Sequence, residues 1–75
     1  MQELEIVVTK LKAELEELNN KIINLENFII GEKYLSISTK QRECLKQQRL
    51  FMTGYKECLV VRIADLNQKI KMEGE

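Results

Sequence analysis

Six side chains whose chemistry suits the binding of anions lie close together near the middle of the chain. Five are cations and one is a tyrosine: Lys33, Tyr34, Lys40, Arg42, Lys46 and Arg49. Lysine and arginine hold phosphates by charge and hydrogen bonds, and the free N–H groups at a helix N-terminus add partial positive charge. A tyrosine ring adds a flat surface. These residues are therefore candidates for a site that binds an anionic ligand.

Structural explanations compete with this interpretation. Cations at the N-terminus of a helix oppose its macrodipole, and the acidic surface of the preceding helix or a neighbouring subunit could compensate for them. Tyr55 and Arg62 form a weaker candidate site. Because Arg62 lies among valines and isoleucine, we expect it to be partly buried, where it needs either an acidic partner such as Glu14 or a ligand phosphate.

Catalysis is not predicted. The chain has no histidine, no cysteine pair at metal-ligand spacing and no phosphate-binding loop. No serine or cysteine has a candidate base near it in the sequence. A hairpin of two helices also has no deep pocket of its own, so we expect neither an enzyme, a cofactor nor a metal site. Any ligand site must be built between subunits.

Composition indicates long helices in one domain spanning residues 1–75. The chain is 44% hydrophobic and 32% charged, with no proline or tryptophan and three glycines. Its net charge is zero, which predicts no bulk attraction to DNA or to a membrane. The sequence shows neither a membrane-spanning run nor a signal peptide. We therefore expect a cytoplasmic protein whose Cys44 and Cys58 remain thiols; on one helix they lie about 21 Å apart.

A first helix is predicted over residues 2–30. Its apolar residues recur at alternating intervals of four and three, which is the heptad pattern of a coiled coil. This seam consists of Leu4, Val8, Leu11, Leu15, Leu18, Ile22, Leu25 and Ile29. Further apolar residues lie off the seam, including Ile6, Val7 and Ile23, and they indicate a second apolar contact.

Residues 31–38 are predicted to form the turn. Gly31 can adopt the left-handed conformation that ends many helices. Ser38 can cap the next helix in a capping box with Gln41, and Ser36 and Thr39 are competing candidates for the cap. We expect Leu35 and Ile37 to fold back over the end of the hairpin. Lys33 and Tyr34 are expected to face outward.

A second helix is predicted over residues 39–72, with a seam of mixed character. Leu45, Met52, Leu59 and Leu66 recur every seven residues, and Cys44, Phe51 and Cys58 widen the stripe. Three residues after each member of the seam the residue is polar: Gln48, Tyr55, Arg62 and Lys69. Gln48 could pair with its symmetry copy to set the register of an assembly. Gly54 is costly in the middle of a helix, which indicates close approach of another helix or a ligand.

Together these elements predict an all-α fold, an antiparallel two-helix hairpin resembling a coiled coil. A connection this short forces neighbouring antiparallel helices. Because apolar residues lie on more than one face of each helix, we expect the hairpin to assemble into a homo-oligomeric helical bundle.

The order of features resembles a known family of phage proteins. A helix ending in Leu25-Glu26-Asn27-Phe28-Ile29 precedes a turn with Glu32-Lys33-Tyr34 and Leu35-Ser36. The second helix then contains Gln41, Arg42, Leu45, Gln48, Met52, Tyr55, Leu59, Arg62 and Ile63 at helical spacings. Over residues 22–66 this pattern is similar to phage-encoded anti-CBASS cyclic-oligonucleotide sponges, whose hairpin is shared with some anti-Thoeris sponges.

The resemblance implies a non-enzymatic homo-oligomer, from a dimer up to a hexamer, in the cytoplasm of a bacterial host. Such proteins sequester cyclic di- or trinucleotide immune signals in pockets between protomers, with tyrosine stacking on bases and lysine or arginine holding phosphates. The short N-terminus departs from members that carry an extra leading helix, which puts one known type of pocket in doubt. The alternative is a coiled-coil assembly module that binds a protein partner through the basic half of the second helix.

Overall fold

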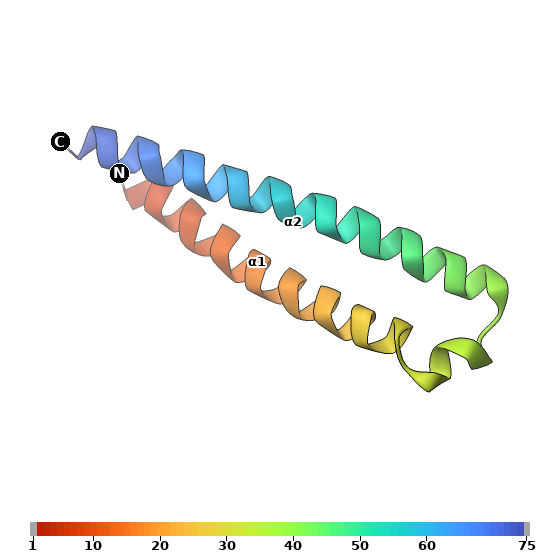
Figure 1. Cartoon of the computed structure of the whole chain (residues 1–75). Coiled ribbons are helices and arrows are strands. Elements are labelled where there is room, and N and C mark those ends of the chain that lie inside the picture. The colour runs from red at the N-terminus through yellow and green to blue at the C-terminus, as the bar shows by residue number, and fades with distance from the viewer. Residues whose placement is uncertain (1, 75) are drawn as a thin grey trace.

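The computed structural model describes residues 2–74, which form two long helices joined by one short helical turn (Figure 1). Helix α1 spans Gln2–Ile29, the 3₁₀ helix η1 spans Glu32–Ser36 and helix α2 spans Thr39–Glu73. The two α-helices run antiparallel, so both ends of the chain lie at one end of a rod measuring 56 × 15 × 15 Å. The predicted antiparallel hairpin is thus confirmed.

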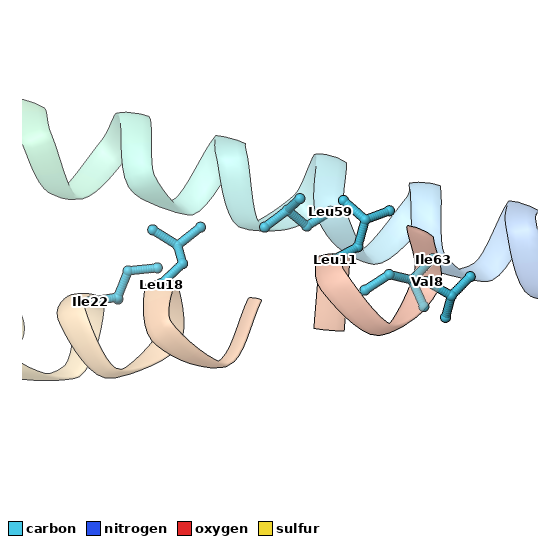
Figure 2. Close-up of a cluster of buried hydrophobic side chains, with 6 residues drawn as sticks. All are labelled: Val8, Leu11, Leu18, Ile22, Leu59 and Ile63. Atoms are coloured by element: carbon cyan, nitrogen blue, oxygen red, sulfur yellow. The ribbon is translucent and has the colours of Figure 1, made fainter. Parts of the chain in front are cut away.

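Helix α1 presents the predicted heptad seam to α2. Four seam residues are buried, Val8, Leu11, Leu18 and Ile22, and the other four are half-buried. Figure 2 shows these four side chains pointing toward α2, where they meet Leu59 and Ile63. Burial of this apolar stripe is the main source of stability for a hairpin of this size, since each fully buried aliphatic side chain contributes about 1.5–3 kcal/mol.

The seam of α2 differs from the predicted one. Leu45, Met52, Leu59 and Leu66 do face α1, but the alternate position lies four residues after each of them, not three. In the C-terminal half of α2 this position holds Ile63, which is buried, and Ile70, which is half-buried. The predicted polar seam therefore faces solvent; its members are Gln48, Tyr55, Arg62 and Lys69.

A heptad pattern allows either alternate position, because its intervals alternate between three and four. In the N-terminal half of α2, the residues three and four positions after each seam residue are both polar. The sequence therefore does not show which of the two faces α1. The observed alternate residues there are Arg49 and Lys56, and Lys56 is half-buried against α1. A long lysine stem can cover apolar surface while its ammonium group reaches water. The polar part of the α2 seam thus consists of these two cations.

Three residues that we expected to widen the stripe are exposed: Cys44, Phe51 and Cys58. Both thiols therefore face solvent instead of packing in the core. Arg62, predicted to be partly buried, is also exposed. The reason is geometric, since a seam that continues through Ile63 turns positions 44, 51, 58 and 62 away from α1.

The turn, residues 30–38, is shaped differently than predicted. Gly31 has φ −87° and ψ 168°, an extended conformation and not the left-handed one. A Cβ atom at this residue would lie 3.3 Å from the carbonyl oxygen of Asn27, so the site is crowded. Leu35 does not fold back, because 76% of it is exposed, whereas Ile37 is half-buried.

Ser38 caps α2 as predicted. Its hydroxyl oxygen accepts a hydrogen bond from the backbone N–H of Gln41 at 3.2 Å. This bond satisfies one of the N–H groups that the first turn of a helix leaves without a partner. The cap fixes the first residue of α2 and with it the direction in which the helix returns along α1.

Large apolar side chains remain on the outer surface of both helices. They include Ile6, Ile23 and Ile30 beside α1 and Leu50, Phe51 and Val61 on α2. Within residues 2–74, no helix combines the length and apolarity that crossing a bilayer requires.

Candidate functional site

Tyr34 lies at the turn end of the hairpin with its ring packed inward. Only 9% of the residue is exposed, and its ring meets Phe28 edge to face with centroids 6.4 Å apart. The phenol hydroxyl donates a hydrogen bond to the carbonyl oxygen of Arg42 at 3.3 Å. The prediction that Tyr34 faces outward is therefore wrong. Its aromatic face is used within the chain and is not free to stack on a ligand in this conformation.

Arg42 completes the same cluster from the first turns of α2. Its guanidinium carbon lies 6.0 Å from the centroid of the Tyr34 ring, in a cation–π contact. Nη2 donates to the hydroxyl of Thr39 at 3.1 Å, and Nη1 donates to the carbonyl of Leu35 at 3.4 Å. The structure thus brings two candidate site residues together, but into a latch that closes the hairpin. We call Phe28, Tyr34 and Arg42 the turn latch.

The other four cations of the candidate site differ in their surroundings. Arg49 forms the only ion pair among residues 2–74, with Glu26 at 3.5 Å, and both side chains are nearly half exposed. An ion pair this accessible to solvent contributes less than about 1 kcal/mol. Lys33, Lys40 and Lys46 are exposed. These three lysines are therefore the cations of this group most available to an anion from outside the chain.

The weaker candidate pair lies in the open on α2. Tyr55 is about half exposed, at 46%, and Arg62 lies seven residues later on the same side of the helix. Phe51, one turn before Tyr55, is 73% exposed. Sequence reasoning missed Phe51 because it assigned this residue to the core stripe. The signal was present in the heptad spacing of Cys44, Phe51 and Cys58, which marks a second stripe beside the true seam.

No enclosed cavity is found within residues 2–74; the surface has only shallow depressions. One of them contains Lys46, Gln47, Leu50 and Phe51, so that a cation and an aromatic ring border the same hollow. Another lies around Gly54. In the described part of the chain, no three side chains of histidine, cysteine, aspartate or glutamate come together as a metal site would require. The site chemistry available is charge, hydrogen bonding and stacking.

Comparison with known proteins identifies the family of the chain. The family model described as Sequestin matches residues 5–65. An uncharacterized 7.5 kDa protein from the denB-rIIB intergenic region of Enterobacteria phage T4 is 38% identical over 55 residues, covering 73% of this chain and 86% of the relative. No solved structure shows a significant match. The resemblance to phage sponges is thereby confirmed, and the chain belongs to the Sequestin family of phage sequestering proteins.

Proposed function

We propose that this protein is a non-enzymatic anti-defence sponge that sequesters a cyclic oligonucleotide immune signal between the protomers of a homo-oligomer. Family membership supports sequestration as the activity, because the matched family covers most of the chain. The observation that carries the ligand class is the coexistence of exposed lysines and the exposed ring of Tyr55 on a hairpin whose residues 2–74 enclose no cavity. A cyclic nucleotide presents phosphates to the lysines and bases to the rings.

A pocket between protomers follows from the shape of the hairpin. A ligand of this size is held by a concave site that covers most of its surface, whereas the described residues form a rod 15 Å thick with only shallow hollows. Two copies that meet around such a hollow would enclose it. Symmetry would also double each contributed cation and ring. We therefore propose a homo-oligomer, from dimer to hexamer, in which each ligand contacts residues from more than one chain.

Within this proposal, the exposure or burial of each side chain decides which role we assign to that residue. Lys40 and Lys46 lie exposed on α2 and are assigned to the phosphates, with Lys33 beside them on η1. Tyr55 is assigned to the bases, because about half of it is exposed. Arg42 and Tyr34 are assigned to holding the turn.

Thermal unfolding in the presence of cyclic di- and trinucleotides tests the function directly. A ligand at 100 times its dissociation constant should raise the free energy of unfolding by about 2.7 kcal/mol per site. Linear dinucleotides with the same bases serve as controls for general affinity to anions. If no cyclic nucleotide raises the unfolding temperature at millimolar concentration, the sponge proposal fails. The assembly-module alternative then takes its place.

The proposed phosphate contacts are tested by removing charge from α2. We expect Lys46→Ala to weaken nucleotide binding about tenfold to 100-fold, because a hydrogen bond to a charged group contributes about 1.5–3 kcal/mol. Lys10→Ala on α1 removes another exposed lysine, one that lies outside the candidate site. Isothermal titration calorimetry compares the two variants with the parent protein. Equal affinities for Lys46→Ala and Lys10→Ala would show that Lys46 is not a phosphate contact.

A further inference from the structure

Gly54 has no explanation within the hairpin. A glycine in the middle of a helix is less favourable than alanine because its backbone loses more freedom on folding. Yet a Cβ atom built at Gly54 meets nothing within 4 Å. The chain therefore gains nothing from the missing side chain unless something outside the hairpin approaches α2 here.

The surface around Gly54 is apolar and faces away from α1. At helical spacings from Gly54 lie Leu50, Phe51, Cys58 and Val61, and all four are exposed. Because the seam through Leu59 and Ile63 is the side of α2 that meets α1, this stripe is not covered by α1. We call these residues, with Gly54, the outward stripe. Leu50, Phe51 and Val61 are 60%, 73% and 67% exposed. A contiguous apolar surface this exposed indicates that another molecule covers it.

We propose that the outward stripe packs against the same stripe of a second copy, antiparallel, with Gly54 of one chain opposite Cys58 of the other. This inference rests on the homo-oligomer of the proposed function and names the face and register through which copies meet. A two-fold axis between Gly54 and Cys58 makes each pairing occur twice. The two smallest side chains of the stripe then meet at the crossing point, where close approach of two helices requires them.

Charge complementarity selects this register. Moving outward from the two-fold axis, this register sets Phe51 opposite Val61, and then the amide of Gln47 opposite the carboxylate of Asp65. At the ends it sets Glu43 opposite Lys69, and nearer the axis it sets Leu50 opposite Arg62, whose methylene stem can cover the leucine while its guanidinium reaches water. All of these residues are exposed in the hairpin and free to pair in this way.

The two neighbouring registers are worse. A shift of one turn that places Gly54 opposite Gly54 sets Glu43 against Asp65, which brings two carboxylates together. The opposite shift, with Cys58 against Cys58, sets Phe51 against the carboxylate of Asp65 and loses its apolar partner. Like charges across a packed interface and unpaired buried charges both oppose association. One register among three therefore gives Phe51 an apolar partner without bringing two carboxylates together.

Cysteine pairs test the register. In a background with Cys44→Ser and Cys58→Ser, the pair Gln47→Cys and Asp65→Cys should form disulfide-linked dimers under mild oxidation. These two positions lie about 27 Å apart on their own helix, so the bond can only join two chains. The matched control is Gln47→Cys with Val61→Cys, which lies on the same face but needs the register with Gly54 opposite Gly54. Denaturing gel electrophoresis without reductant measures the linked fraction, and the first pair should exceed the control at least tenfold. Equal linkage in both pairs, or none in the first, overturns the proposal.

Substitution of Gly54 tests the interface without relying on the disulfide. We expect Gly54→Leu to keep the helical circular dichroism signal while raising the dissociation constant of this contact about 100-fold, because the inserted side chain overpacks both partners. Gly54→Ala should raise helical content and weaken association less. Light scattering at micromolar concentration reports the mass, and an unchanged subunit number for helical Gly54→Leu overturns the proposal. Neither readout uses a nucleotide, so a failure of the ligand proposal leaves this test intact.

Discussion

Replacing Leu59 with alanine should lower the free energy of unfolding by about 2–5 kcal/mol, the range found when a fully buried leucine is truncated. Leu59 has 0% exposure, the lowest in the described part of the chain, and it packs in the cluster that contains Val8, Leu11 and Ile63 (Figure 2). The loss combines the transfer energy of the deleted atoms with the cavity left behind. Urea denaturation followed by circular dichroism measures it. Protein concentration is held constant, because association shifts apparent stability.

Leu35→Ala is the matched control for this prediction. The substitution deletes the same atoms, but Leu35 lies on η1 with 76% of its surface exposed. We expect a change within about 0.5 kcal/mol, as for other surface substitutions that remove no buried contact. A cost for Leu59→Ala as small as that for Leu35→Ala would mean that the helices do not pack through this seam.

The hairpin could be predicted because periodicity alone specifies much of it. The seam of α1 repeats without interruption, and every one of its residues lies at least half-buried against α2. The seam of α2 was harder because Arg49 and Lys56 interrupt its apolar pattern. A cation at a seam position cannot be distinguished by type from a cation on a solvent face. The rotation of α2 about its axis is therefore set by Ile63 and Ile70. The seven-residue repeat of leucines obscured the fact that these two isoleucines belong to the seam.

The candidate site was predictable in composition but not in arrangement. The sequence locates Lys40 and Lys46 on a basic stretch, and their exposure follows from the rotation of α2. The position of Tyr34 could not be read in the same way, because a 3₁₀ turn has no long periodic pattern that would indicate which side faces inward. Its burial depends on contacts with Phe28 on one helix and Arg42 on the other. Such contacts between elements appear only when the turn is folded.

Truncation of Tyr34 should be the second costly substitution in the chain. We expect Tyr34→Ala to lower the free energy of unfolding by about 2–4 kcal/mol, somewhat less than for an aromatic residue in a central core because the site is at the end of the hairpin. The variant loses the edge-to-face contact with Phe28, the cation–π contact with Arg42 and the hydrogen bond to its carbonyl. Urea denaturation measures the loss under the conditions used for Leu59→Ala.

Tyr34→Phe distinguishes a role of the Tyr34 ring in the turn latch from a role in contacting the ligand. It keeps the ring and removes only the hydroxyl that donates to the Arg42 carbonyl, so the expected cost is about 0.5–1.5 kcal/mol. If the ring serves the turn latch, nucleotide affinity of the folded Tyr34→Phe protein should equal that of the parent, measured by calorimetry well below the unfolding temperature. A Tyr34→Ala protein that is as stable as the parent but binds nucleotide more weakly would contradict the latch. That result would assign the ring to the ligand and require η1 to open when the ligand binds.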